Sequence, residues 1–370
     1  MTGKAIFFGG GLPDPSTYPA EALARHLSGV LHEEAGPALT YETGPGVRVL
    51  RAAVADQVSR RDAAHYDADQ VSITSGSAGG ILLVALAFLE ADDVVFVEEF
   101  TYPGAVKAFR RFGANIVACP VDAAGLLPER LASLIARCVA GGRRPKAIYF
   151  GANFANPVGG YLPVDRRQAL ARLAIEHEMI LVQDDTYGSI RFSESIPPSM
   201  LCFARDHAIE LGSFSKTVAP GLRLCWTASS ERMAAALTAT RTDLGVSPVL
   251  QRALGRYLAS GEFDTHLTEI RALYQCKRDA LAEALARHCS EHATWKVPDG
   301  GFFVWLTLAR GSGDALLEAS RRHEVAFLPQ SYFSASSLDG PCLRLAYGER
   351  DMPELDEGAR RLGLAMEDCG

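Results

Sequence analysis

The sequence predicts an α/β protein with a large domain built on a mostly parallel, doubly wound sheet and a small α+β domain made from both chain ends. Short runs rich in valine and isoleucine alternate with amphipathic segments, which is the order of strands joined by crossover helices. The short runs are apolar throughout, as in strands that helices cover on both faces. The 370 residues of the chain are enough for two domains.

Six apolar runs in the middle of the chain are expected to be strands. They are residues 92–100, 114–121, 145–154, 179–185, 208–215 and 222–229. Between the third run and the fourth, Leu170, Leu173 and Ala174 recur at helical spacing, so residues 164–179 are expected to form a helix with one apolar face. Ligands of doubly wound sheets bind beyond the carboxyl ends of the strands. The loops after these runs are therefore where a site is expected.

From about residue 285 the order changes to strands followed by a helix. The runs "TWKVPDGGFFVWLTL", "EVAFLPQSYF" and "CLRLAYG" are typical of strands, and "DMPELDEGARRLGLAM" is typical of a closing helix with a proline in its first turn. The turn-rich N-terminal stretch "GGGLPDPSTYP" is expected to pack with them. We therefore expect a large domain over residues 36–284 and a small domain over residues 1–35 and 285–370.

Composition and charge argue against several classes of partner and site. The net charge is −7 with acidic and basic residues interspersed, which argues against nucleic acid as a partner. No apolar run is long enough to cross a bilayer and the N-terminus lacks the pattern of a signal peptide, so we expect a cytoplasmic protein without a membrane partner. The eight cysteines are scattered and form no C-x-x-C pair or Cys/His cluster, so neither a metal site nor a disulfide framework is expected.

The stretch "SFSKTVAPGLRL" places Lys216 in a short loop between two of the predicted strands. A lysine in a partly desolvated site has a lowered pKa and becomes a nucleophile, although a single loop lysine is more often a surface residue. Around it, Ser213, Ser215 and Arg223 provide hydroxyls and a guanidinium, which are groups that bind a phosphate. The loop therefore combines a candidate nucleophile with a candidate phosphate site.

Other predicted loops offer complementary groups. Residues 76–80 are small and precede a helix, where backbone amides and the helix dipole favour an anion. Asn156 lies in the turn "NPVGG", and Tyr102 follows another strand. Asp184 and Asp185 end a strand, and the one that faces inward needs a cation or strong donors. Each loop alone is typical of a turn or a helix cap, but together they match a pyridoxal-phosphate site, which needs a lysine, a carboxylate, a phosphate cradle and a stacking ring.

With these motifs the chain resembles the class I and II aminotransferases of pyridoxal-phosphate fold type I. Within that family it is most similar to the branch of 2-aminoadipate, kynurenine and aromatic aminotransferases. The resemblance runs from "GGGLPDPSTYP" to "LRLAYG", and the combination of "NPVGG", "QDDTYG" and "SFSKTVAPGLRL" makes it specific. It implies the fold of that family, pyridoxal 5'-phosphate as cofactor, and transfer of an amino group between an α-amino acid and a 2-oxo acid.

The resemblance also implies a role for each matching residue. Lys216 would bind the cofactor as a Schiff base and move the proton in catalysis, and Asp184 would bind the pyridine nitrogen. Tyr187 and Asn156 would hydrogen-bond the 3-oxygen of the ring. The remaining cofactor contacts in the same subunit would be Ser77, Ala78, Tyr102, Ser213, Ser215 and Arg223, with Tyr102 stacked on the ring.

Three further residues would complete the site. Arg344 would pair with the substrate α-carboxylate beside Asn156, and Gly11 would lie against the substrate. Tyr41 would reach the phosphate of the neighbouring subunit, which implies a homodimer with shared active sites.

Four positions depart from the family pattern, Ala78, Phe100, Cys225 and Gln330, and they leave the substrate and the net reaction open. A pyridoxal-phosphate lyase, or an elimination, replacement or carbon–carbon-bond-forming enzyme of specialised biosynthesis, would use the same lysine, aspartate and arginine. A regulatory pyridoxal-phosphate-binding module is a further alternative, because some transcription factors carry this fold. The presence of Lys216 favours an enzyme.

Overall fold

A seven-stranded sheet forms the centre of the larger part of the molecule. The computed structural model describes residues 5–193 and 195–369, and the sheet has the strand order β2-β10-β9-β8-β7-β3-β4. In that order the strands are Val71–Ser75, Leu224–Ser229, Ala208–Ser213, Ile180–Asp184, Pro145–Gly151, Val94–Glu98 and Asn115–Cys119. β10 is antiparallel to β2 and β9, and the other pairings in this sheet are parallel, so the predicted mostly parallel sheet is confirmed.

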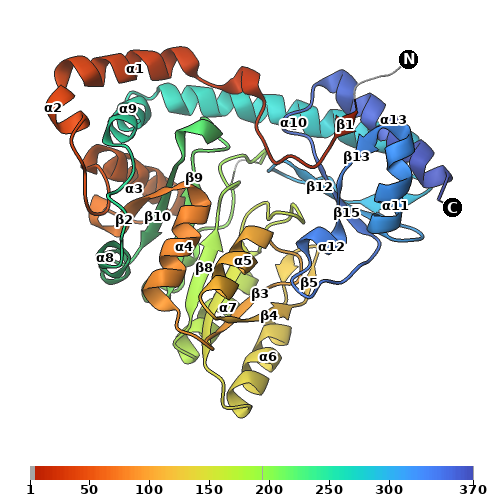
Figure 1. Ribbon diagram of the computed structural model, residues 1–370, viewed down its shortest axis with the longest axis horizontal. Helices are drawn as coiled ribbons and strands as arrows, with labels where there is room; N and C mark the ends of the chain where they lie inside the picture. The colour runs from red at the N-terminus through yellow and green to blue at the C-terminus, as the bar shows by residue number, and fades with distance from the viewer. Residues whose placement is uncertain (1–4, 194, 370) are drawn as a thin grey trace.

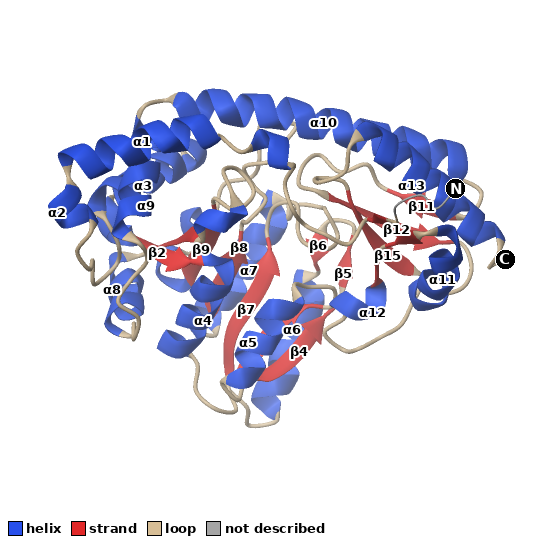
Figure 2. Ribbon diagram, turned by 45° about the horizontal axis from the view of Figure 1, so that its top comes forward, coloured by secondary structure: helices blue, strands red, loops and turns tan. Residues whose placement is uncertain are grey.

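Helices cover both faces of this sheet (Figure 2). Helices α3, α6 and α7 contribute to the core on one face, and α4, α5 and α8 contribute to the core on the other. In chain order they are α3 Arg48–Asp62, α4 Gly76–Phe88, α5 Pro103–Arg111, α6 Pro128–Ala140, α7 Val164–Glu176 and α8 Glu231–Ala239. In β3, Phe96 packs in the first core and Val97 in the second, because successive side chains of a strand point to opposite faces.

A second, four-stranded sheet lies beside the first. Its order is β11-β12-β15-β14, and its pairings are antiparallel. These strands are Ala293–Trp295, Phe303–Leu308, Cys342–Ala346 and Leu328–Pro329. Its core includes apolar residues of helices α11, Gly313–Ser320, and α13, Met352–Glu367. The N-terminal strand β1, Ile6–Phe7, pairs with β13, Val325–Ala326, so the start of the chain lies with its end.

Helix α10, Glu262–His288, links the two parts along one side of the molecule (Figure 1). Phe263, near its start, belongs to the core beneath the large sheet. Leu281 and Leu285, near its end, belong to the core of the second sheet. A single helix therefore touches both cores.

Helix α1, Ala20–Glu33, falls in the segment expected to belong to the small domain, yet it packs on helix α9, Pro248–Ala259, beside the large sheet. The physical reason is an apolar cluster in which Val30 of α1 meets Ala253 of α9. In this respect the structure differs from the expected grouping of residues 1–35. The division into two domains itself stays a prediction.

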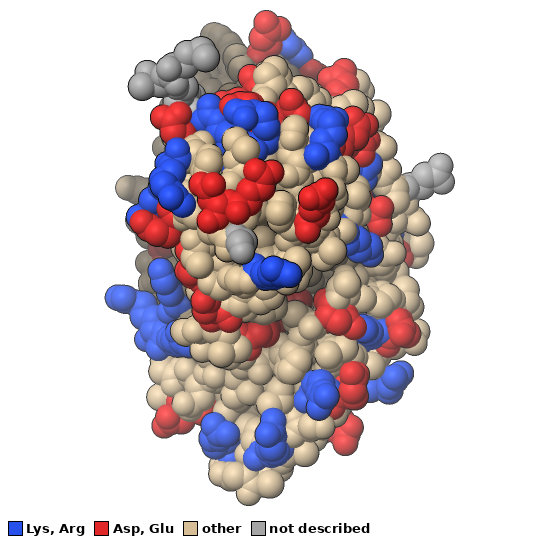
Figure 3. Space-filling model, turned by 90° about the vertical axis from the view of Figure 1, so that its right-hand side faces the viewer, with Lys and Arg blue, Asp and Glu red and all other residues tan. Residues whose placement is uncertain are grey.

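The remaining elements are short. They are helices α2, Ala35–Ala38, and α12, Gln330–Phe333, the hairpin strands β5, Val121–Asp122, and β6, Gly125–Leu126, and 3-10 turns at Pro15–Thr17, Ala68–Gln70, Met200–Cys202, Arg205–His207, Pro220–Leu222 and Arg321–His323. On the face shown in Figure 3, basic and acidic side chains are interspersed. Within the described ranges, no helix has the length and apolar character needed to cross a membrane.

Candidate active site

A cavity of about 110 Å³ opens at the carboxyl ends of the central strands. It is lined by Ser77, Glu98, Thr101, Tyr102, Tyr149, Gly151, Asn153, Ala155, Asn156, Asp184, Thr186, Tyr187 and Lys216. The parallel strands β3, β7, β8 and β9 end at the same edge of the sheet, which is why residues far apart in the sequence meet there. Six predicted site residues line this cavity: Ser77, Tyr102, Asn156, Asp184, Tyr187 and Lys216.

Lys216 is half-buried in the loop after β9. Its Nζ donates a hydrogen bond of 2.6 Å to the carbonyl oxygen of Gly11 and lies 5.6 Å from the centre of the Tyr187 ring. Burial lowers the pKa of Lys216 to about 8, and the positive charge of Arg344 also lowers it. A substantial fraction of this amine is therefore neutral near physiological pH.

Asp184 closes strand β8 with its carboxylate oriented by neighbouring donors. The phenol of Tyr149 donates to Oδ2 at 2.6 Å. The backbone amide and the hydroxyl of Thr186 donate to Oδ1 at 3.1 and 2.6 Å. The carboxylate is held in one orientation at the edge of the cavity, as a group that pairs with a ring nitrogen requires.

Asp185 faces away from this cavity, as expected of one of two adjacent acids. It is buried, accepts a hydrogen bond of 2.5 Å from Asn153 and pairs with Arg61 at 3.3 Å. Arg61 also pairs with the carboxylate of Glu210. Burial raises the pKa of Asp185 to about 7, and the nearby Glu210 carboxylate also raises it. This buried network forms behind the active site.

The groups predicted to bind a phosphate lie around the start of α4. Gly76 has a φ of +76°, and a Cβ there would collide with the guanidinium of Arg223. The Ser213 hydroxyl accepts from the backbone amide of Ser215 and from the thiol of Cys225, each at 3.0 Å. Backbone amides at a helix start, a guanidinium and two hydroxyls form a set that suits a phosphate.

Ala78 and Tyr41 lie outside the cavity lining. Ala78 is exposed on the first turn of α4. Tyr41 is 78% exposed and lies near Leu39 in the sequence, which is 69% exposed.

Arg344 is buried on strand β15, beside the cavity. Its guanidinium lies between the rings of Phe303 and Phe333, 4.1 and 4.7 Å from their centres. It donates to Asn156 Oδ1 at 2.5 Å and to the carbonyl oxygen of Gly9. Its Nε has no partner among the residues that the structure describes. Burial lowers the pKa of Arg344 to about 10. A buried guanidinium with a free donor suits an anionic ligand.

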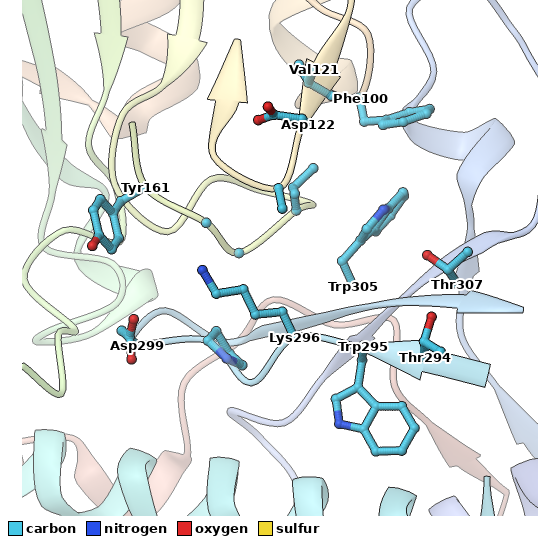
Figure 4. A pocket seen from close by; sticks show the side chains of 15 residues that line it. Phe100, Val121, Asp122, Tyr161, Thr294, Trp295, Lys296, Asp299, Trp305 and Thr307 are labelled. Atoms are coloured by element: carbon cyan, nitrogen blue, oxygen red, sulfur yellow. The ribbon is translucent and has the colours of Figure 1, made fainter. Parts of the chain in front are cut away.

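A further cavity of about 380 Å³ has Phe100 and Trp305 in its lining (Figure 4). Trp305 is the strand partner of Arg344, and its ring lies 5.4 Å from the ring of Phe100. Figure 4 shows Trp305 and Lys296 directed into this cavity and Trp295 turned away from it. Phe100, one of the positions that depart from the family pattern, thus lines this further cavity and not the one that holds Lys216.

Sequence reasoning missed several groups of the cavity. Tyr149, Thr186 and Asn153 appeared only as parts of a strand or turn. Glu98 is buried at the end of β3, where its carboxyl accepts a hydrogen bond of 2.9 Å from the amide of Gly151. Burial raises the pKa of Glu98 to about 8. An acid at the end of an apolar strand, as in "VVFVEEF", was the available signal.

The family described as aminotransferase class I and II matches residues 10–362 of this chain. The chain belongs to this family. The 2-aminoadipate transaminase of Thermus thermophilus is 32% identical over 98% of this chain and 90% of that protein. The crystal structure of Pyrococcus horikoshii kynurenine aminotransferase is 32% identical in sequence to this chain. The match covers 99% of this chain and 92% of that chain, with a TM-score of 0.94.

A relative of another kind is the uncharacterized HTH-type transcriptional regulator YisV of Bacillus subtilis. It is 30% identical over 96% of this chain and 72% of that protein. The family and the aminotransferase relatives show that this chain is a pyridoxal-phosphate-dependent aminotransferase of fold type I, and they do not favour the lyase alternative. The roles of individual residues stay predictions.

Proposed function

We propose that the cavity at the ends of β8 and β9 holds the pyridoxal ring and that Lys216, Asp184 and Arg344 carry out the transfer of an amino group between an α-amino acid and a 2-oxo acid. The observation that carries this proposal is the position of Lys216 and Asp184 on one cavity, with phosphate-binding groups at the adjoining start of α4. When bound, pyridoxal phosphate supplies an electron-accepting ring conjugated to the reacting carbon. The Ser213, Ser215 and Arg223 side chains would hold its phosphate.

Asp184 would keep a proton on the ring nitrogen. Three hydrogen bonds from Tyr149 and Thr186 hold its carboxylate in place, so little reorganisation is needed when charge develops nearby. Asn156 and Tyr187 would donate to the 3-oxygen of the ring. Tyr102, which also lines the cavity, would stack on the ring.

Lys216 would act as the general base once the substrate has replaced it on the cofactor. It would take the proton from the substrate Cα and deliver it to carbon C4′ of the cofactor. A base works best when its pKa is close to the working pH, and the pKa of Lys216 near 8 meets this condition. The same neutral amine is what a covalent attachment to an aldehyde needs.

Arg344 would bind the substrate α-carboxylate. The phenyl rings of Phe303 and Phe333 exclude water from its two faces, which strengthens an ion pair there. Asn156 already accepts from one of its nitrogens, while its Nε remains for the ligand. Gly9 and Gly11 accept hydrogen bonds from Arg344 and Lys216, so the N-terminal segment would move or rebind as the substrate enters.

We further propose a homodimer in which Tyr41 reaches the phosphate of the neighbouring active site. Its 78% exposure, in a segment that also exposes Leu39, supports a surface that a second subunit covers.

The decisive test is Lys216→Ala in the reconstituted enzyme. We expect the variant to stay folded, to lose the visible absorption of the bound cofactor and to lose transfer activity. Retained activity would refute the mechanism.

A screen of amino-acid donors against 2-oxoglutarate and pyruvate identifies the substrate class. Release of ammonia or of a leaving group without reciprocal transfer would instead support the lyase, and binding without turnover would support a regulatory module.

A further inference from the structure

A second cavity, of about 240 Å³, lies behind the two catalytic loops. These are the loop after β8, which begins with Asp185, and the lysine loop after β9, which holds Lys216. It lies between α3, the loop after β8, the lysine loop and the start of α10. The two cavities share no lining residue. Neighbours in sequence divide between them instead: Asp184 lines the front cavity and Asp185 the back one, and Lys216 lines the front while Thr217 lines the back. A ligand in the back cavity would therefore touch the catalytic loops from behind.

Four arginines line the back cavity, and two of them have carboxylate partners. Arg61 pairs with Asp185 at 3.3 Å and with Glu210. Arg60 lies 4.0 Å from Asp264. The charges of these two arginines are therefore offset within the protein.

Arg191 and Arg271 have no such partner. In residues 5–193 and 195–369, neither lies within 4.0 Å of a carboxylate oxygen. Arg271 uses its Nε to donate to the Ser189 carbonyl at 2.8 Å, and both side chains are half-buried. Burial and the nearby Arg191 lower the pKa of Arg271 to about 10. Two partly desolvated positive charges close together are unfavourable unless an anion lies between them.

We propose that the back cavity binds the phosphate group of a small anionic ligand through Arg191 and Arg271. Asp185 and Asp264 also line this cavity, but in the described residues no carboxylate lies within 4.0 Å of Arg191 or Arg271. A phosphate dianion between the two guanidiniums would supply two negative charges. Guanidinium groups also match phosphate oxygens through paired hydrogen bonds. A volume of about 240 Å³ leaves room for a few further atoms beyond the phosphate.

Such a ligand would act on both catalytic loops. Arg271 of α10 holds the Ser189 carbonyl in the loop after β8. His266, one turn earlier on α10, donates to the Thr217 carbonyl beside Lys216 at 2.9 Å. A phosphate between Arg191 and Arg271 would therefore tighten the loop of Asp184 onto the helix that also contacts the lysine loop. Ser213, one of the proposed contacts of the cofactor phosphate, also lines the back cavity, whereas Arg191 and Arg271 have no proposed role in transamination.

The test measures phosphate binding to the holoenzyme, in which the cofactor fills its own phosphate cradle. Inorganic phosphate is titrated calorimetrically at constant ionic strength, with chloride as the balancing anion, and glycerol 3-phosphate is titrated in a second arm. We expect saturable binding and a rise in Tm with phosphate concentration. In Arg191→Gln we expect about tenfold weaker binding or more, as for one lost hydrogen bond to a charged group. Arg172→Gln, on the exposed side of α7, removes the same charge elsewhere and should bind as the wild type does.

Arg191→Gln is the sharper variant because the Arg191 side chain makes no hydrogen bond within the described residues whose loss would disturb the fold, whereas Arg271→Gln also removes the contact to Ser189. Arg191→Lys should retain part of the affinity. Tighter binding of glycerol 3-phosphate than of inorganic phosphate would assign the site to a phosphorylated metabolite, and equal or weaker binding would assign it to the free ion. Absence of saturable binding, or equal affinity in wild type and Arg191→Gln, would overturn the proposal.

Discussion

Charge balance differs between the cations in front of the catalytic loops, Lys216 and Arg344, and Arg61 behind them. In front, Lys216 and Arg344 are buried among aromatic rings and carbonyls, with no carboxylate paired to either in the described residues. Behind, Arg61 is surrounded by Asp62, Asp185 and Glu210. A charge that the protein neutralises itself stabilises the fold, and a charge left unpaired is available to a ligand. The presence or absence of a carboxylate partner therefore distinguishes cations that stabilise the fold from cations that are available to a ligand.

Adjacent residues at the end of strand β8, Asp184 and Asp185, provide the strongest test of this difference. Asp184→Asn should lower kcat by about 10³-fold, the upper range for removing a group that stabilises developing charge. Asp185→Asn in the same loop is the matched variant and should keep kcat within about tenfold of wild type when corrected for the folded fraction. Steady-state kinetics and cofactor absorption of both purified variants decide the matter. Similar losses in the two would show that the front and back of the loop are not separate.

Stability should respond in the reverse order. Asp185→Asn disturbs the hydrogen bonds that the buried carboxylate accepts from Asn153 and Arg61, which costs roughly 1.5–3 kcal/mol of the free energy of unfolding. Asp184 accepts hydrogen bonds from Tyr149 and Thr186 but has no cationic partner within the described residues, so Asp184→Asn should cost less. Urea unfolding of the two apoenzymes measures both values. A larger loss in Asp184→Asn would contradict the assignment of Asp185 to the structural network.

A third comparison concerns two arginines, Arg344 in front of the catalytic loops and Arg61 behind them. Arg344→Lys should raise KM for the amino-acid substrate by about 10- to 100-fold, because one hydrogen bond to a charged group contributes roughly 1.5–3 kcal/mol. Arg61→Lys should leave KM unchanged and lower the free energy of unfolding, since Arg61 bonds to Glu210, Asp62 and Asp185 together. KM measurements beside thermal unfolding of both variants distinguish the two roles.

The last expected effect concerns Glu98, a buried acid of the front cavity. Burial raises its pKa from the ordinary 4.5 to about 8, so the folded state holds its proton more firmly than the unfolded state does. Its contribution to stability is then fully present below pH 4.5 and is lost as the pH rises to about 8. Relative to Glu98→Gln, the wild-type apoenzyme should lose stability across this range. Glu176→Gln, an exposed control on α7, should show no such pH-dependent difference.

Much of the front cavity was predictable because each of its main residues follows a strand within a recognisable local motif. Lys216, Asp184, Asn156 and Tyr187 all line the cavity as the strand order required. The partners that hold them were not predictable. Tyr149 comes from 35 positions away in the sequence to bond Asp184, and the Gly9 carbonyl comes from 335 positions away to bond Arg344. No local pattern in the sequence marks such pairs.

The sequence by itself determined the class of fold, the order of the central strands along the chain, the family and the residues that follow each strand. These depend on local composition and periodicity, which the chain carries in short windows. Only the tertiary structure decided that β10 runs antiparallel, that α1 packs on α9, and that Arg61 is neutralised while Arg191 and Arg271, within the described residues, are not. These depend on which distant side chains share one low-dielectric space, and that is a property of the packed molecule.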